Sequence, residues 1–346
     1  MNTSNTRKYR PKSGEQKLVA LSISYEREHM LRRGMRIEHL RELLIGLAGT
    51  LIRGGANLAY AGHWRDCDDN FTYDLLRLIS AEREDRTFAT ATSSPPLGWL
   101  YNHLAWPHFL LVTPQIEAQW INSCRIIRIS QADAGIAPTY LTSDPPTLTG
   151  GDQLALNSAI VLSAMRNLAT TGMSVAVPGM PPNQSQIIPR LSARVFLGGK
   201  TIGYSGFLPG LFEEALLSLE QSIPMYILGG FGGSAGVLKD ALLAMKGTRP
   251  VELTLPWHQQ TTPQVQKLET LLSNHPDKLP PGMRSTQGLL DALYQRIDMA
   301  RGSLAVALNT NLTEPETLEL MTTIDIRRAV HLCLKALMPD AVPASA

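Results

Sequence analysis

Residues 193–219 read ARVFLGGKTIGYSGFLPGLFEEALLSL, an apolar run that ends in paired glycines and continues, after a second glycine segment, into two adjacent glutamates. The apolar run predicts a buried β-strand, and the segment after residue 209 predicts a helix. Gly198 and Gly199 allow positive φ angles and let a ligand approach the main chain without a Cβ in the way. The stretch therefore predicts a strand, a turn and a helix, with a site for an anion such as a phosphate at the turn.

Charged side chains accompany these glycines. Lys200 follows them directly and can reach a phosphate as a point charge. Pro209 and Gly210 open the helix, and Glu213 and Glu214 fall in its first turn, where carboxylates suit ribose hydroxyls or acid–base work. The alternative is a tight strand-to-helix turn followed by a solvated helix start, which needs no ligand.

The composition excludes several classes of protein. The chain has 346 residues, of which 44% are hydrophobic and 18% charged, enough for a large buried core. Its formal net charge of +2 predicts neither a nucleic-acid surface nor a polybasic membrane anchor, and no apolar run approaches the roughly 20 residues of a membrane span. The three cysteines lack CxxC spacing, so neither a disulfide framework nor a zinc cluster is indicated. We expect a cytoplasmic protein with no metal site and no required cofactor.

From residue 17 onward, short apolar runs alternate with longer amphipathic ones, as in a mostly parallel sheet flanked by helices. We predict a Rossmann-like α/β fold with a disordered tail at 1–15, a single nucleotide-binding domain at 16–340 and a helical C-terminal part at 255–338. The expected strands are KLVALSISY, NLAYAGHW, HFLLVTPQI, RIIRIS, ARVFLGG and PMYILGG. The segment 170–189, long and rich in Pro, Gly and Gln, is the best candidate for a mobile lid.

The carboxyl ends of parallel strands form the ligand crevice of such folds, so the strand ends are expected to converge. The candidate ligand-binding residues at these ends are Ser22, Ser24, Gly62, His63, Gly198, Gly199, Lys200, Gly229, Gly230, Gly232 and Gly233. The glycine loop at 229–233 opens a helix and suits an anion, and the alternative is close helix-to-strand packing. A lone histidine such as His63 is more often satisfied by hydrogen bonds than used as a general base.

Five ordered segments resemble the SLOG superfamily, the Rossmann-like group that includes the Lonely Guy cytokinin-activating phosphoribohydrolases and the DprA proteins. They are ALSISY, LIRGGANLAYAGHWRDCDDNFTYDLLRLI, SAMRNL, the opening stretch at 193–219, and PMYILGGFGGSA. The resemblance covers roughly residues 17–338. It is closest to the branch associated with TIR and Sir2 domains in bacterial antiviral systems.

The phosphoribohydrolase signature PGGxGTxxE falls on Gly198 and Gly199, and on Glu213 or, better, Glu214. The match is interrupted by the extra residues KTIGYSG, and no proline precedes the glycines. These departures weaken the transfer of catalytic roles.

The arginine upstream of this signature in the enzymes is matched by Arg166, with Arg190 and Arg194 as competitors. In the TIR/Sir2-associated branch, the same pocket is similar to a receptor for cyclic ADP-ribose-type signals. Lys200 and Glu214 match its ligand contacts.

The resemblance implies a sensor that binds an ADP-ribose-like or cyclic ADP-ribose-type nucleotide in antiviral defence and acts through homo-oligomerisation or a separate TIR- or Sir2-type partner. The alternative is an enzyme that hydrolyses the N-glycosidic bond of a nucleotide or of NAD. Glu214 would then stabilise an oxocarbenium-like sugar or activate water, and Arg166 would orient the phosphate or the leaving base. DNA binding in the manner of DprA is a weaker third reading, because no basic stripe is visible in the sequence.

Overall fold

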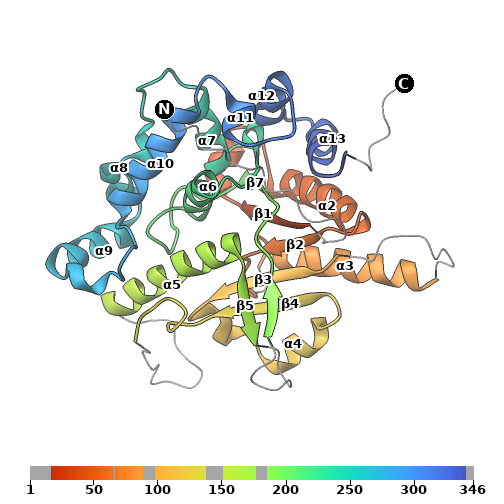
Figure 1. Cartoon of the computed structure of the whole chain (residues 1–346), viewed down its shortest axis with the longest axis horizontal. Helices are drawn as coiled ribbons and strands as arrows, with labels where there is room; N and C mark the ends of the chain where they lie inside the picture. Colours follow the sequence, from red (N-terminus) through yellow and green to blue (C-terminus); the bar gives the residue numbers. More distant parts are fainter. Residues whose placement is uncertain (1–16, 66, 89–97, 138–150, 177–184, 340–346) are drawn as a thin grey trace, which may run out of the picture.

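The computed structural model of the chain describes residues 17–65, 67–88, 98–137, 151–176 and 185–339, and these residues build a parallel six-stranded sheet at the centre of the fold (Figure 1). The strands are β1 (Leu18–Ser24), β2 (Asn57–Tyr60), β3 (Leu100–Ala105), β4 (Cys124–Ile129), β7 (Ala193–Gly198) and β8 (Met225–Leu228). Their order across the sheet is β4-β3-β2-β1-β7-β8. The predicted Rossmann-like α/β fold is confirmed.

The chain reverses its direction of travel across the sheet at β1. From β1 it builds outward to β4, and it then returns to the other side of β1 for β7 and β8. The topological switch point, where open α/β sheets hold their ligands, therefore lies between the carboxyl ends of β1 and β7. The register pairs Ser24 with Gly198 at this point.

One face of the sheet is covered by α5 (Asp152–Thr171), α6 (Gly210–Glu220) and α7 (Gly233–Leu243), with α9 (Pro263–Asn274) and α10 (Thr286–Ala300) packed behind them. The opposite face carries α2 (Ile37–Arg53), α3 (Phe71–Phe88), α12 (Glu314–Thr322) and α13 (Ile326–Leu337). Successive residues of β1 enter the two cores in turn, because side chains alternate across a strand. Both faces are buried, which explains why β1, β7 and β8 read as nearly continuous apolar runs.

The remaining elements are short. They are α1 (Arg27–Leu31), η1 (His108–Leu111), α4 (Pro114–Trp120), η2 (Gly229–Phe231), η3 (Val251–Leu253), α8 (Leu255–Thr261), η4 (Pro276–Lys278) and α11 (Leu304–Ala307). A separate antiparallel ribbon joins β5 (Met173–Ala176) to β6 (Ser185–Ile188). The ribbon lies within the segment 170–189 that was expected to form a lid. Residues 177–184 of that segment lie outside the described residues, as does the predicted tail at 1–15.

Local signals in the sequence explain two helix boundaries. Gly54 caps the end of α2, and the Asn70 side chain accepts the backbone N–H of Thr72 at 2.8 Å at the start of α3. The mainly helical segment after residue 250 is confirmed. Every helix in the described part of the chain is too short or too polar to span a bilayer.

One predicted strand is wrong. HFLLVTPQI forms η1 and the start of α4, because Pro114 occupies the first turn and Thr113 Oγ1 caps the helix by accepting the N–H of Ile116 at 3.3 Å. The strand at this position in the sheet is β3, with the sequence LYNHLA. Its polar residues conceal it in the sequence, but Asn102 is fully buried and donates to the carbonyl oxygens of Tyr60 and Gly62 at 3.1 and 2.9 Å.

Candidate functional site

The turn that follows β7 is attached directly to the end of β1. The Gly199 N–H donates to the Ser24 carbonyl at 2.7 Å, and the Lys200 N–H donates to Ser24 Oγ at 2.9 Å. Two of the predicted site segments, 22–24 and 198–200, are thus joined by main-chain hydrogen bonds at the switch point.

The Lys200 side chain reaches back over the sheet toward the loop that follows β2. Its Nζ lies 3.4 Å from Asp69 Oδ2, and 42% of the side chain is exposed. The ammonium group therefore sits at the open edge of the crevice, where a diffusing anion can reach it. Asp69 was not among the predicted residues.

Close backbone packing requires the glycines of the two loops. Gly198, Gly199 and Gly233 have φ angles of 61°, 99° and 63°. A Cβ on Gly199 would lie 2.6 Å from Leu211 Cδ2, and one on Gly233 would lie 2.5 Å from the Gly198 carbonyl carbon. The loop before α7 and the turn after β7 therefore touch main chain to main chain, which an added methyl group would prevent.

Three other predicted glycines are also explained by packing. At Gly62, a Cβ would lie 2.0 Å from Tyr60 Cε1. At Gly229 it would lie 2.4 Å from Lys239 Cβ, and at Gly230 it would lie 2.1 Å from the Thr323 carbonyl oxygen. The structure therefore gives these glycines a structural reason that is independent of any ligand.

Several amides of the crevice bind acceptors within the protein. Glu26 Oε2 accepts both the N–H and the hydroxyl of Thr201, at 2.6 and 2.7 Å. His29 Nδ1 accepts the Gly233 N–H at 3.0 Å, and burial lowers the pKa of this imidazole, which favours its neutral accepting form. The Glu26 carboxylate therefore satisfies both donors of Thr201. Sequence reasoning missed both residues, although they follow β1 closely.

Two buried arginine–glutamate pairs lie deeper, beneath the start of α6. Arg166 Nη1 contacts Glu213 Oε2, and Arg194 Nη1 lies 2.9 Å from Glu214 Oε2. All four residues are buried. Sequence reasoning placed Arg166 near these glutamates with Arg194 as a competitor; in the structure each arginine takes one glutamate.

Arg194 also ties β7 to its neighbours. Its Nη1 donates to Ser22 Oγ at 3.2 Å and its Nη2 donates to Thr170 Oγ1 at 2.6 Å. The other competitor, Arg190, donates to the carbonyl of Gln221, away from these glutamates. Ser22, predicted as a ligand contact, is thus engaged with a buried guanidinium.

Gly210 lets the first turn of α6 lie over the Arg166 guanidinium. A Cβ on Gly210 would be 3.2 Å from Arg166 Nη2, and one on Gly206 would be 3.0 Å from Nη1. The loop before α6 therefore wraps closely around this arginine. Small residues at both positions are needed for that approach.

His103 on β3 is a buried titratable group that sequence reasoning missed. Burial, together with the nearby positive charge of Arg194, lowers its pKa to about 4. It is therefore neutral at physiological pH.

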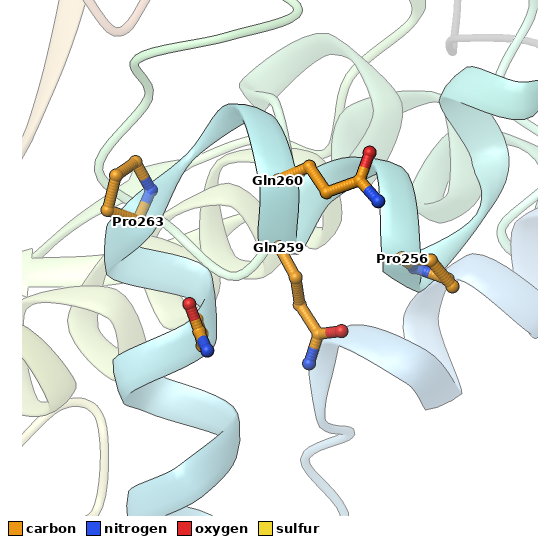
Figure 2. Close-up of a pocket in the computed structure, with 5 residues that line it drawn as sticks. Pro256, Gln259, Gln260 and Pro263 are labelled. Carbon is orange, nitrogen blue, oxygen red and sulfur yellow. The ribbon is translucent and has the colours of Figure 1, made fainter.

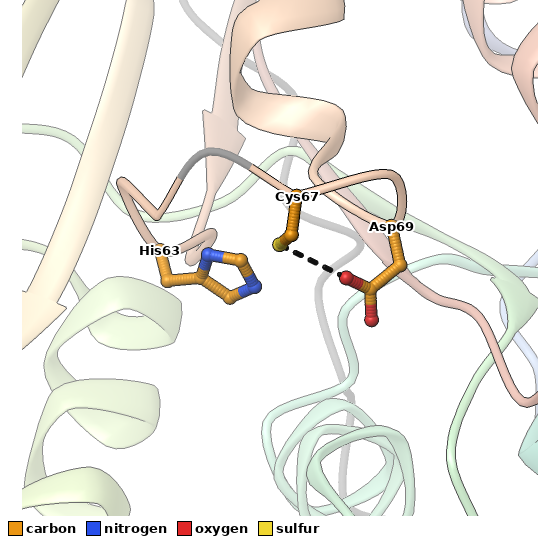
Figure 3. A group of neighbouring side chains, drawn as sticks. All are labelled: His63, Cys67 and Asp69. Atoms are coloured by element: carbon orange, nitrogen blue, oxygen red, sulfur yellow. Dashed lines mark hydrogen bonds between the residues drawn. The ribbon is translucent and has the colours of Figure 1, made fainter.

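Three metal-ligating side chains meet in the loop between β2 and α3 (Figure 3). His63, Cys67 and Asp69 each offer one ligand atom, and these atoms all lie within 4.8 Å of one another. The Cys67 thiol donates to Asp69 Oδ1 at 3.1 Å. The absence of CxxC spacing concealed this group; the signal that could have found it is His, Cys and Asp together in the seven residues 63–69, shortly after a strand.

Two hollows lie away from the switch point. One, of about 430 Å³, is lined by Pro256, Gln259, Gln260, Pro263 and Gln266 (Figure 2). It has no charged lining, so it does not suit a phosphate. The other, of about 400 Å³, lies between α5, α6 and the start of α10, and Glu213 and Arg284 are among its lining residues.

Comparison with known proteins gives one family. The profile of the family described as SLOG cluster2 matches residues 13–320. A comparison with curated proteins gives no significant match.

Proposed function

The chain belongs to the SLOG cluster2 family, which is linked to nucleotide binding, and we propose that it is a sensor for a nucleotide signal of the ADP-ribose or cyclic ADP-ribose type. The observation that carries this proposal is the position of the exposed Lys200 ammonium beside the Ser24–Gly199 junction of β1 and β7. This is the switch point, where folds of this class hold their ligands. A lysine there supplies the charge that a diphosphate needs.

Neighbouring groups extend the site from the phosphates to the sugars. The N–H and the hydroxyl of Thr201 form a pair of donors, and in this structure both donate to Glu26 Oε2. A phosphate oxygen has the same acceptor chemistry, so binding would replace one anion by another at this position. The Ser24 hydroxyl on the same edge suits a ribose hydroxyl.

The buried ion pairs favour binding over hydrolysis. Glu213 and Glu214 each face a guanidinium, so neither carboxylate is free to approach an anomeric carbon or a water molecule without breaking a buried pair. Their role in the proposed sensor is to fix the first turn of α6 beside the ligand. Incubation with NAD and with nucleoside monophosphates should then release no free base, as judged by chromatography. Turnover that Glu214→Gln abolishes would support the N-glycosidase alternative instead.

The output of the sensor is a further part of the proposal. The resemblance to SLOG domains associated with TIR and Sir2 proteins supports an antiviral role, in which ligand binding changes self-association or recruits a separate TIR- or Sir2-type partner. Light scattering of the purified chain with and without ligand tests the first route. A change of molar mass on ligand addition is expected if self-association is the output, and an unchanged mass would leave recruitment as the output.

Isothermal titration against cyclic ADP-ribose, ADP-ribose and NAD tests the binding itself. At least one of them should bind the wild type, and Lys200→Ala should weaken binding by at least about tenfold, the value of one charge-assisted contact. Lys267→Ala removes the same charge from an exposed position on α9 and should leave affinity unchanged. If no nucleotide binds, or if both variants behave alike, the proposal fails.

A further inference from the structure

We propose that His63, Cys67 and Asp69 form a binding site for a thiophilic divalent metal ion such as Zn²⁺. Their ligand atoms lie within 4.8 Å of one another, close enough for a single ion to contact all three. Figure 3 shows the three side chains pointing toward one another from one short loop. Imidazole, thiolate and carboxylate are the ligand types that Zn²⁺ takes, and three protein ligands leave a fourth position open.

Hydrogen bonds from neighbouring elements hold the part of the loop around His63. The Asn102 side chain donates to the Gly62 carbonyl at 2.9 Å and accepts from Trp64 Nε1 at 2.8 Å. The Thr72 hydroxyl donates to the His63 carbonyl at 2.8 Å. These bonds fix the backbone on both sides of His63 before any ion arrives, which lowers the cost of assembling the site.

The existing contacts of the three side chains are weak enough to give way to an ion. His63 Nδ1 accepts only a long hydrogen bond, 3.3 Å, from the Arg65 N–H. Cys67 Sγ points at Asp69 Oδ1, so an ion between them replaces one S–H···O contact by a metal–sulfur and a metal–oxygen bond. The thiol proton leaves to solvent in that exchange. Thiolate and imidazole together select Zn²⁺ over Mg²⁺ or Ca²⁺, which prefer oxygen.

Lys200 supports the site from outside. The two oxygens of Asp69 face different groups: Oδ1 faces Cys67 and Oδ2 faces Lys200 Nζ at 3.4 Å. One carboxylate can therefore bind the ion and keep its ion pair with Lys200. Such outer partners orient metal ligands and raise affinity.

The charge of the crevice gives the ion a role that rests on the proposed function. Lys200 is paired with Asp69 at this edge of the crevice. A divalent ion bound beside that pair would add positive charge where the diphosphate is proposed to lie, and its open position can accept a phosphate oxygen.

Titration of the full chain with Co²⁺, a spectroscopic substitute for Zn²⁺, tests the site without any nucleotide. Wild type should develop the thiolate-to-cobalt charge-transfer band, and Zn²⁺ should abolish it by competition. Cys67→Ser should lose the band, and His63→Gln and Asp69→Asn should weaken Zn²⁺ binding by at least about tenfold. Asp68→Asn removes an exposed carboxylate from the same loop and is the matched control, with affinity unchanged.

Cys67 is exposed, so its substitution leaves the core intact, and equal melting temperatures of the metal-free proteins verify this. A missing band in wild type, or a band that persists in Cys67→Ser, overturns the proposal.

The nucleotide titration is then repeated with Zn²⁺ and with a chelator. Tighter nucleotide binding with Zn²⁺, absent in Cys67→Ser, supports the role at the phosphates. If the cobalt band forms but Zn²⁺ does not change the affinity for the nucleotide, the metal site stands and its role at the phosphates is refuted. A cobalt band with no nucleotide binding in either condition refutes the proposed function alone.

Discussion

The Lys200 ammonium lies 3.4 Å from the Asp69 carboxylate, so the turn after β7 and the loop after β2 meet across the end of β1. This contact joins segments separated by 131 positions in the sequence. It places the exposed lysine of the switch point next to the group formed by His63, Cys67 and Asp69. The proposed phosphate contact and the proposed metal site are therefore neighbours.

Glu26→Gln should tighten nucleotide binding. The Glu26 carboxylate occupies the two donors of Thr201, and a phosphate oxygen must displace it. The neutral amide is a weaker acceptor and does not repel phosphate, so affinity should rise on the order of tenfold. Titration calorimetry measures the change, with Glu28→Gln on exposed α1 as the control. Unchanged or weaker binding by Glu26→Gln would show that Thr201 does not meet the phosphates.

Gly233→Ala should damage both stability and binding, whereas Gly203→Ala should cost only the strain of its backbone. The two residues have nearly equal φ angles, 63° and 64°. A methyl group at 233 would lie 2.5 Å from the Gly198 carbonyl carbon, but none of the atoms in the described residues lies within 4 Å of one at 203. Urea unfolding should show a loss of about 1–2 kcal/mol for Gly203→Ala and a larger loss for Gly233→Ala. Equal losses would contradict the close contact of the two loops.

Much of the fold could be predicted because its signals are local. The apolar run of β7 and the helix that begins after Pro209 depend on near neighbours in the chain. β3 was missed because Asn102 and His103 look polar in sequence although both are buried. The partners of Asn102 lie on and just after β2, which the sequence does not place beside it.

The site was predictable only in part, for the same reason. Lys200 could be identified from the adjacent glycines. Its contact with Asp69 and the contact of Glu26 with Thr201 depend on the strand order of the sheet, which brings distant segments together. The division of two arginines between two glutamates depends on side-chain direction on β7 and α5, which spacing alone does not give.

Arg194→Met should destabilise the protein strongly, because it strands the buried Glu214 carboxylate without its counter-ion. Removal of one partner of a buried pair costs about 3–5 kcal/mol. Adding Glu214→Gln removes the stranded charge and should recover part of the loss. Arg328→Met breaks the exposed pair with Glu319 and should change the unfolding midpoint little. Similar losses in the two single variants would mean that the Arg194 pair is not buried as described.

Acid should destabilise the fold through His103. Burial and Arg194 lower its folded pKa to about 4, whereas the unfolded residue titrates near 6.5. Between these two pKa values His103 is protonated in the unfolded chain and neutral in the folded chain. The free energy of unfolding therefore falls as the pH drops from about 6.5 to about 4, by roughly 3 kcal/mol in all. Above that window the residue is neutral in both states and contributes no pH dependence.

His103→Gln should reduce this acid slope in unfolding experiments between pH 7 and 4. The exposed His331 provides the control, since His331→Gln should leave the slope unchanged. A slope that is identical in wild type and His103→Gln would place the acid sensitivity in other groups.

A crystal structure of the chain with bound ADP-ribose tests the central claim most directly. We predict the diphosphate at the switch point between β1 and β7, within hydrogen-bonding distance of Lys200 Nζ and next to Ser24, with Glu26 displaced from Thr201. Density for the diphosphate in the hollow lined by Pro256 and Gln260, or elsewhere away from Lys200, would contradict the account.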